Sequence, residues 1–159
     1  EFVLPDTMET LFCRINALLE EEHIKKSQIS SSGSSSITYI LDAIDTVSAK
    51  IALAAYADEH SIPLISSMGT GNKLHPELFR ISDLKDTSVC PLCRVMRKEL
   101  KTRGIQSLKV CWSPEKPLTP APAEEDTGSR RSTPGSISFV PPAAGLMIAG
   151  EIVRNICGL

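Results

Sequence analysis

The sequence has no long apolar run, no large excess of charge of either sign and no regular cysteine framework. Its longest apolar stretch, residues 137–153, contains two prolines and Glu151 and falls short of the roughly 20 apolar residues that a transmembrane helix needs. The net charge is −2, so any nucleic acid has to be bound through a local basic patch. Five irregularly spaced cysteines are not typical of a secreted, disulfide-bonded protein. We therefore expect a soluble, cytoplasmic chain without a membrane segment.

Length and composition indicate about one globular domain. The chain has 159 residues, of which 42% are hydrophobic and 23% charged. It does not begin with methionine, which leads us to expect a fragment of a longer protein. We predict a single, partial domain over residues 1–159, with flexible insertions at 25–36, which is rich in serine and glycine, and at 113–133, which is rich in proline and charge.

The clearest structural pattern lies between residues 37 and 67. Residues 37–41 form a short, mainly apolar run that suits a strand buried on both faces of a parallel sheet. Helix-forming sequence follows at once, with Asp45 or Thr46 able to cap it, and residues 62–67 resemble a second buried strand. A strand, a helix and a strand with short joins predict a right-handed parallel crossover.

The remaining segments predict further helices and strands around this unit. We expect an amphipathic helix from Asp6 to about residue 22, a strand at 78–81, a helix at 90–102, a strand at 105–112, an extended segment at 134–142 and a helix at 143–157 that buries Ala144, Met147, Ile148, Ile152 and Ile156. Together these elements predict an α/β fold, a Rossmann-like, mostly parallel sheet with flanking helices.

Two aspartates follow the first predicted strand. Asp42 and Asp45 lie at or just beyond its carboxyl end, where open α/β sheets bind their ligands. A carboxylate at this place can reach a nucleotide or its Mg²⁺ ion. The alternative is structural, because acids often cap helices and interact well with the helix dipole. Lys50, one turn into the helix, either offsets phosphate charge or is an ordinary solvated lysine.

A glycine-containing loop follows the second predicted strand. Gly69 and Gly71 match the first two glycines of a dinucleotide fingerprint, but Leu74 occupies the third position and Pro76 interrupts the following helix. We therefore do not interpret the loop as a phosphate-binding turn of its own. Glycines still permit a close approach of the backbone to a ligand, so the loop either lines the same crevice as Asp45 or is a plain turn.

The predicted helix at 90–102 carries a basic face. Arg94, Arg97, Lys98 and Lys101 lie on it, in a chain that is otherwise slightly acidic. Such a face can neutralise RNA phosphates. The alternative, solvated cations near a helix carboxyl end, is equally compatible with the pattern.

Several segments resemble one enzyme superfamily. The segment LDAIDTVSAK is similar to the D-x-x-D-N-x-x-T-R loop of the ThiF/MoeB superfamily, the ATP-dependent adenylating enzymes that include ubiquitin-activating enzymes. In that loop the later aspartate assists ATP and its magnesium; Asp45 matches it, and Lys50 replaces the usual arginine. The segments SMGTGNKL and GSISFVPP are similar to the TcdA branch, also called CsdL or YgdL, whose members are tRNA threonylcarbamoyladenosine dehydratases.

The resemblance implies a function and a set of partners. It implies the carboxyl-terminal part of a ThiF-type fold and ATP-dependent cyclisation of threonylcarbamoyladenosine at position 37 of tRNA. ATP and Mg²⁺ would be the cofactors, with Asp45 as catalytic and metal-binding residue and Asp42, Lys50, Gly69 and Gly71 beside the nucleotide. The four cations would bind tRNA. A homodimer and a sulfur-transfer partner are also expected.

Two alternatives follow from departures from the family. The family's amino-terminal half, with its glycine-rich nucleotide turn, is absent from this sequence, so a catalytically inactive fragment is one alternative. Adenylation of a ubiquitin-like sulfur-carrier protein is the other; paired zinc-binding C-x-x-C motifs would favour it.

A single C-x-x-C motif is present, formed by Cys90 and Cys93. Structural zinc needs about four ligands, and no second pair accompanies this one. A redox dithiol lacks a thioredoxin-like context in the sequence, and a thioester cysteine, which some adenylating enzymes use, lacks an evident activating neighbour. We expect buried or half-buried structural thiols.

Overall fold

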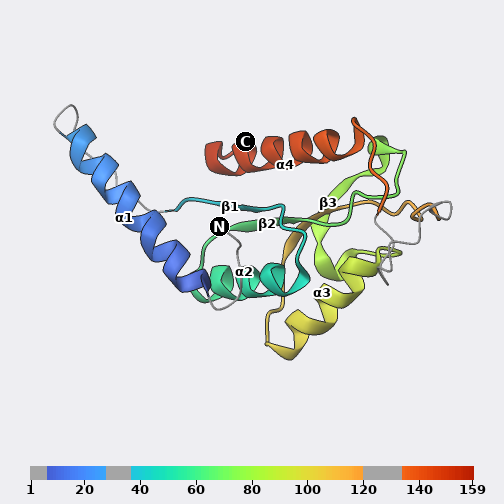
Figure 1. Cartoon of the computed structure of the whole chain (residues 1–159), viewed down its shortest axis with the longest axis horizontal. Helices are drawn as coiled ribbons and strands as arrows, with labels where there is room; N and C mark the ends of the chain where they lie inside the picture. Colours follow the sequence, from blue (N-terminus) through green and yellow to red (C-terminus); the bar gives the residue numbers. More distant parts are fainter. Residues whose placement is uncertain (1–6, 28–36, 120–133) are drawn as a thin grey trace, which may run out of the picture.

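The computed structural model describes residues 7–27, 37–119 and 134–159. The elements are α1 (Met8–Ser27), β1 (Ile40–Asp42), α2 (Val47–Glu59), β2 (Leu64–Ser67), η2 (Pro76–Leu78), β3 (Arg80–Asp83), η3 (Leu84–Asp86), α3 (Pro91–Thr102), β4 (Lys109–Trp112) and α4 (Val140–Cys157). The strands form a four-stranded sheet in the order β1-β2-β4-β3, which Figure 1 shows between its helices. Neighbours are parallel except β3, which runs antiparallel to β4. The predicted α/β class and mostly parallel sheet are confirmed.

The predicted crossover is present as β1, α2 and β2. β1 and β2 pair in parallel with Ile40 opposite Leu64 and Asp42 opposite Ser66. Their carboxyl ends therefore lie level with each other at one edge of the sheet. This edge is where ligands of open α/β sheets bind, so the register decides which side chains meet there.

Helices cover both faces of the sheet. α2 and α3 lie on one face and α4 on the other (Figure 1). The larger core cluster is formed with α2 and α3 and includes Leu53, Met96 and Trp112. A smaller cluster under α4 joins Ile65 of β2 to Ile148. The sheet is thus a middle layer whose inner strands are buried on both sides.

The first predicted strand is shorter and less buried than expected. β1 begins at Ile40, lies at the border of the four-stranded sheet and leaves Leu41 45% exposed. The prediction of a strand buried on both faces is therefore wrong. The physical reason is the position of α4, which packs mainly on β2 and β4 in the middle of the sheet and less on β1 at its border.

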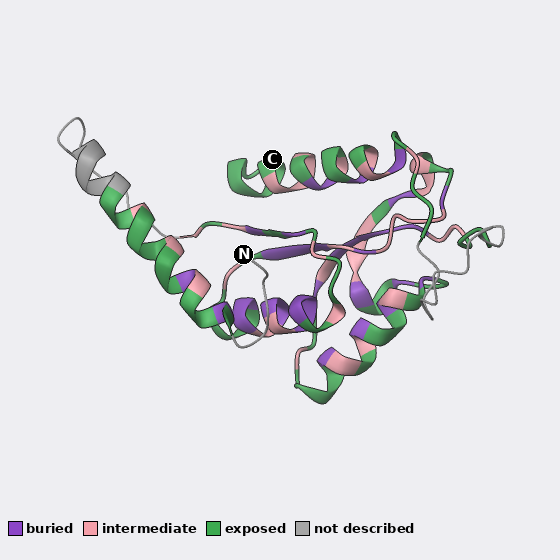
Figure 2. Ribbon diagram, in the orientation of Figure 1, coloured by how far each residue is buried: buried purple, intermediate pink, exposed green. Residues whose placement is uncertain are grey.

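The last helix starts earlier than predicted. Residues 134–142 were expected to be extended, but α4 begins at Val140 and contains Pro141 and Pro142 in its first turn. First-turn N–H groups have no partner within the helix, so proline is tolerated there. Ile148 is buried as predicted, whereas Ile156 is 55% exposed, and Figure 2 shows the outer face of α4 exposed. None of the described helices is both long enough and apolar enough to cross a membrane.

The first helix is longer than predicted. α1 continues to Ser27, beyond its expected end near residue 22 and into the predicted insertion at 25–36. The rest of that insertion lies outside the described residues. Met8 and Phe12 attach the helix to the core, and the rings of Phe12 and Tyr56 stack with their centroids 4.1 Å apart.

The start of the second predicted insertion is held in place. Residues 113–119 are described, Ser113 is buried, and the Leu118 N–H donates to the Asn72 carbonyl oxygen at 2.8 Å. Residues 120–133 lie outside the described part of the chain. The segment after β4 is therefore attached to the loop after β2 over at least its first residues.

Candidate functional site

A buried ion pair joins the carboxyl end of β1 to α2. Lys50 Nζ lies 3.0 Å from Asp42 Oδ2, and the two side chains are 2% and 1% exposed. Asp42 also accepts from the Ser66 hydroxyl at 2.5 Å and from the Ile44 N–H at 2.9 Å. Lys50 donates further to the Ser66 hydroxyl at 3.3 Å and to the Ser67 carbonyl oxygen at 2.8 Å. Both carboxylate oxygens and all three ammonium hydrogens thus have partners.

This network stabilises the edge of the sheet where a ligand was predicted. It connects β1, β2 and α2, and no buried side-chain nitrogen or oxygen in the described part of the chain lacks a partner. In this arrangement Asp42 and Lys50 contact each other, so their contact with a nucleotide remains a prediction. Ser66 was missed by the sequence reasoning; the only signal for it is its position opposite Asp42 in the parallel register.

Asp45 is exposed three residues beyond β1. Its described hydrogen bond comes from the neighbouring Thr46 hydroxyl at 3.3 Å. Mg²⁺ keeps several of its waters and is held by one or two carboxylates together with substrate phosphates. Asp45 fits such an ion, because its carboxylate is open to solvent, whereas the buried and fully bonded Asp42 does not. Among the described residues, no group of three or more His, Cys, Asp and Glu side chains is arranged to hold a metal ion.

The two glycines of the loop after β2 have different surroundings. A Cβ at Gly69 would meet nothing within 4 Å, whereas a Cβ at Gly71 would lie 2.9 Å from the Cβ of Pro134. Next to it, the Asn72 N–H donates to the Gly135 carbonyl oxygen at 2.8 Å, and the Gly135 N–H donates to Asn72 Oδ1 at 2.6 Å. Gly71 therefore accommodates the segment that leads into α4, and Gly69 is the glycine with open space beside it.

Glu115 holds the far side of the same loop and was not predicted. Its carboxylate accepts from the backbone N–H groups of Leu74 at 2.9 Å and His75 at 3.2 Å. Its carbonyl oxygen accepts from Lys73 Nζ at 2.6 Å. The loop after β2 is thus fixed from both the segment after β4 and the segment before α4.

The predicted basic face of α3 separates into two kinds of residue. Arg94, Lys98 and Lys101 are exposed. Arg97 is partly buried and donates to the carbonyl oxygens of Thr87 at 2.9 Å and Leu84 at 3.2 Å, and to the Thr87 hydroxyl. Three cations are therefore available to a polyanion, while the fourth supports the turn before α3.

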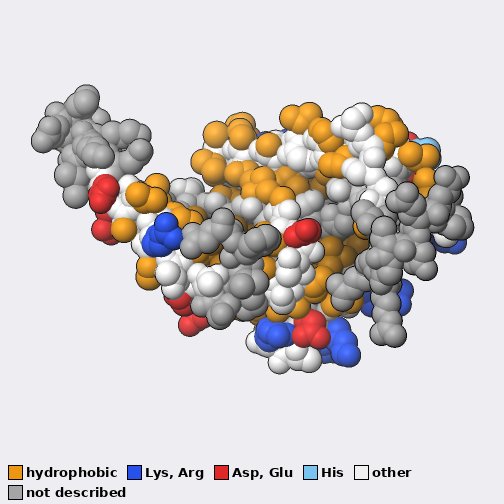
Figure 3. Space-filling model, viewed as in Figure 1, with side chains coloured by type: hydrophobic (Ala, Val, Ile, Leu, Met, Phe, Trp, Pro, Cys, Tyr) orange, Lys and Arg blue, Asp and Glu red, His pale blue; other side chains and the backbone are white. Residues whose placement is uncertain are grey.

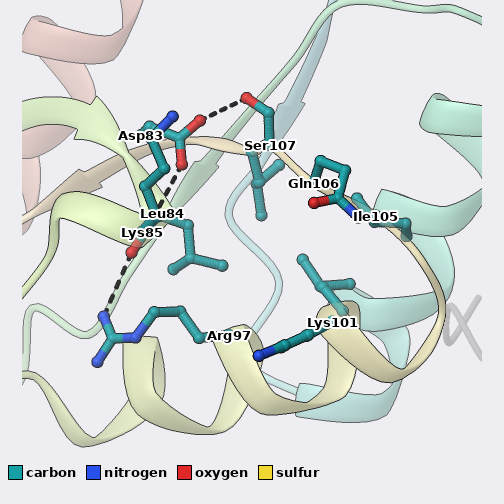
Figure 4. Close-up of a pocket in the computed structure, with 10 residues that line it drawn as sticks. Asp83, Leu84, Lys85, Arg97, Lys101, Ile105, Gln106 and Ser107 are labelled. Atoms are coloured by element: carbon teal, nitrogen blue, oxygen red, sulfur yellow. Dashed lines mark hydrogen bonds between the residues drawn. The ribbon is translucent and has the colours of Figure 1, made fainter.

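A cavity of about 410 Å³ lies at the end of the strands opposite to Asp45 (Figure 4). Asp83, Arg97, Lys101 and Ser107 are among its lining residues. Asp83 pairs with Lys109, the first residue of β4, so the cavity lies at the amino end of that strand, away from Asp45. It is therefore separate from the predicted nucleotide edge.

Asp83 is the acid of this cavity. Burial alone would raise its pKa, but hydrogen bonds from the Ser107 hydroxyl and the Lys85 N–H outweigh burial and lower the pKa below its usual value. The Lys85 N–H bond is 2.9 Å long. Asp83 is thus held in its charged form by its own chain, as Figure 4 shows for the contact with Ser107.

The chain resembles known proteins over most of its length. It is 34% identical to a tRNA threonylcarbamoyladenosine dehydratase of Bacillus subtilis over 129 residues, which cover 76% of this chain and 51% of that protein. The chain is thus similar to tRNA threonylcarbamoyladenosine dehydratases. It is also 36% identical to tRNA threonylcarbamoyladenosine dehydratase 2 of Saccharomyces cerevisiae over 121 residues, 72% of this chain and 27% of that protein. No protein-family model matches the chain.

Solved structures of these dehydratases share the fold. A structure of TcdA (CsdL) superposes with a TM-score of 0.68 at 23% identity, covering 99% of this chain and 55% of that one. The Escherichia coli enzyme in complex with ATP superposes with a TM-score of 0.54 at 22% identity, covering 97% and 57%. The likeness to these structures establishes the fold. Our chain spans about half the length of the Bacillus subtilis dehydratase that it matches.

Proposed function

We propose that this chain forms the carboxyl-terminal part of an ATP-dependent tRNA threonylcarbamoyladenosine dehydratase. The observation that carries the proposal is the exposed Asp45 carboxylate at the carboxyl edge of the parallel strands, in a chain similar to these dehydratases. An Escherichia coli relative of the same fold has been solved in complex with ATP. ATP would activate the threonyl carboxylate, and intramolecular attack on the activated carboxylate would close the ring with net loss of water.

The residues at the edge have distinct roles in this proposal. Asp45 would hold a hydrated Mg²⁺ ion, which neutralises charge on the phosphates of ATP. Gly69, with open space beside it, would allow the backbone of the loop after β2 to approach the nucleotide. Asp42 and Lys50 would act indirectly. Their buried ion pair fixes the end of β1, and Asp45 follows this end of the strand.

The exposed cations of α3 would contact tRNA. Arg94, Lys98 and Lys101 lie on one helix and are open to solvent. Each contact with a phosphate releases a bound counterion, so affinity should fall with salt. Arg97 would position the helix, since its guanidinium is bonded to the preceding turn.

A partner would complete the enzyme. Leu146, Val153 and Ile156 on α4 are 75%, 56% and 55% exposed, and Figure 3 shows hydrophobic side chains gathered over this helix. An exposed apolar face of this kind supports an interface, in the first instance with a second copy of the chain. A sulfur-transfer partner and a cytoplasmic location remain predictions.

ATP binding tests the role of Asp45. In titrations with ATP and Mg²⁺, the Asp45→Asn chain should bind at least about tenfold more weakly, because a charged metal ligand is lost. The matched control is Asp86→Asn. Asp86 is an exposed acid in η3, at the opposite end of the strands, so this variant should bind ATP like the unsubstituted chain. Equal ATP affinity for Asp45→Asn and the unsubstituted chain would remove Asp45 from the site.

Activity distinguishes the proposed function from its alternatives. A protein in which this chain is joined to the amino-terminal half of the Bacillus subtilis relative is incubated with ATP, Mg²⁺ and tRNA that contains threonylcarbamoyladenosine. Loss of one water mass from the nucleoside supports the proposal. ATP–pyrophosphate exchange that depends on a ubiquitin-like sulfur carrier, without water loss, would indicate the adenylating alternative. Absence of both activities would indicate an inactive remnant.

tRNA binding tests the basic face separately. Replacing Arg94, Lys98 and Lys101 together by Gln should weaken tRNA binding and reduce the slope of log affinity against log salt by about 2 to 3. Arg103→Gln is the control, since Arg103 is already paired with Glu99 at 2.9 Å. An unchanged slope in the triple variant would exclude this face.

A further inference from the structure

The C-x-x-C motif lies at the start of α3. Cys90 is the residue immediately before the helix, Pro91 is its first residue, and Cys93 lies in its first turn. Side chains three positions apart on a helix are neighbours, with Cβ atoms about 5–6 Å apart. A disulfide requires Cβ atoms roughly 3.5–4.5 Å apart, so the two Cβ atoms have to approach by about 1–2 Å to form the bridge.

The two thiols have unequal environments. The pKa of the Cys90 thiol lies well below its usual value, chiefly because of the neighbouring Cys93; burial opposes this, and the N–H groups of Cys93, Leu92 and Gly69 add to the lowering. The same contact with Cys90, together with burial, raises the pKa of Cys93. The pKa of Cys90 is therefore shifted downward and that of Cys93 upward. This inequality is what a nucleophilic and a resolving cysteine need.

A strained turn precedes the motif. Val89 has φ of +62° although it is β-branched, and the Cys90 N–H donates to the Ser88 carbonyl oxygen at 2.5 Å across it. Such three-residue turns are rare, and β-branched residues seldom adopt them. Val89 is 44% exposed and Pro91 is exposed, so the buried Cys90, 5% exposed, lies between two exposed residues, whereas Cys93 is fully buried.

The structure also argues against the simpler readings of the motif. Among the described residues no third ligand completes a metal site with Cys90 and Cys93. The sequence alone shows no thioredoxin-like context. The tertiary structure places Cys90 immediately before α3 and brings the backbone of Gly69, from the loop after β2, next to it.

We propose that Cys90 and Cys93 are a redox-active dithiol that low-molecular-weight disulfides, such as glutathione disulfide, convert reversibly into an intramolecular disulfide. The Cys90 thiolate attacks one glutathione sulfur, and one glutathione thiolate leaves. Cys93 then loses its proton and attacks the Cys90 sulfur, so that the second glutathione leaves as a thiolate. Two protein thiols are oxidised to one disulfide, and glutathione disulfide is reduced to two molecules of glutathione. The inference does not depend on the proposed tRNA activity.

Trapping of thiols in the unsubstituted chain tests the proposal. The chain is equilibrated with graded ratios of glutathione disulfide to glutathione, quenched with acid, alkylated with N-ethylmaleimide and mapped by mass spectrometry. We expect a linked Cys90–Cys93 peptide that increases with the ratio, disappears completely with dithiothreitol, and forms while Cys111, which is as buried as Cys93, stays reduced. The proposal is overturned if Cys90 and Cys93 stay reduced while the exposed Cys157 carries glutathione. It is also overturned if Cys90 carries a stable glutathione adduct.

Variants assign the two roles. Cys93→Ser should accumulate a glutathione adduct on Cys90, because the resolving thiol is missing. Cys157→Ser is the matched control and should form the internal disulfide to the same extent as the unsubstituted chain. A Cys93→Ser chain that retains helical circular dichroism and gains no adduct on Cys90 would contradict the assignment of Cys90 as the nucleophile.

Discussion

Lys50 Nζ and Asp42 Oδ2 lie 3.0 Å apart, and both side chains are almost fully removed from solvent. The pair connects the first turn of α2 to the last residue of β1, and Ser66 on the neighbouring strand bonds to both partners. Buried charges are costly unless they are paired and hydrogen-bonded, and here they are. The base of the candidate nucleotide edge is therefore built by the chain itself, and Asp45 is the acid left facing solvent.

Removing one partner of this pair should destabilise the fold strongly. Asp42→Ala leaves the Lys50 ammonium buried without its counter-ion, so we expect the free energy of unfolding to fall by about 3–5 kcal/mol. The double variant Asp42→Leu, Lys50→Met should recover part of this loss. Equilibrium unfolding in urea measures both. Asp45→Ala, at an exposed acid, should change stability by no more than about 0.5 kcal/mol. An equal effect of Asp42→Ala and Asp45→Ala would contradict the described network.

Gly71 should be less tolerant of a side chain than Gly69. A Cβ at Gly71 would lie 2.9 Å from the Cβ of Pro134, so Gly71→Ala must displace the segment before α4. We expect a loss of about 1–3 kcal/mol in the free energy of unfolding. Gly69→Ala, which meets nothing within 4 Å, should remain close to the unsubstituted chain. Thermal unfolding of the two variants is the measurement, and the reverse order of stability would be inconsistent with this packing.

Arg97 should contribute to stability where its neighbours on α3 do not. Its guanidinium bonds to the carbonyl oxygens of Leu84 and Thr87, and hydrogen bonds from charged groups are worth about 1.5–3 kcal/mol. Arg97→Gln should therefore lower the free energy of unfolding by about that amount. The exposed Arg94→Gln on the same helix should lower it by less than about 0.5 kcal/mol. Urea midpoints that agree for the two variants would argue against a supporting role for Arg97.

The ion pair under α4 should make stability depend on pH. Hydrogen bonds from Lys109, at 2.6 Å, and from Asn155 lower the pKa of Glu151 against the opposing effect of burial. Because the folded pKa lies below the unfolded value of about 4.3, the contribution is complete above that pH and is lost as pH falls through the lowered folded pKa.

The corresponding experiment compares Glu151→Gln with the unsubstituted chain from pH 7 to pH 3. The pair is partly exposed, so we expect a difference of about 1 kcal/mol or less at pH 7 that shrinks below about pH 4. Glu59→Gln, at an exposed glutamate at the end of α2, controls for loss of a carboxylate. A difference that grows on acidification would have the wrong sign.

The hydrophobic pattern alone was enough to predict the β1–α2–β2 unit, α3 and the α/β class. The reason is that buried apolar residues recur with the period of the helix or strand that carries them. Two of its failures have an identifiable physical reason. Residues 134–142 are predicted to be extended, but α4 begins at Val140, because the first turn of a helix accepts Pro141 and Pro142. Leu41 was expected to be buried, but its burial depends on which strands α4 covers.

The sequence by itself determined which residue types stand at the ends of the strands, and its similarity to the dehydratases determined the family to which they are compared. Only the tertiary structure decided how those residues divide. It paired Asp42 with Lys50 and left Asp45 exposed, and it tied Arg97 to the preceding turn while Lys98 stayed in solvent. It also brought Gly69 next to Cys90. Such partners are set by strand order, register and helix docking, which are properties of contacts between distant segments and cannot be inferred from periodicity within one segment.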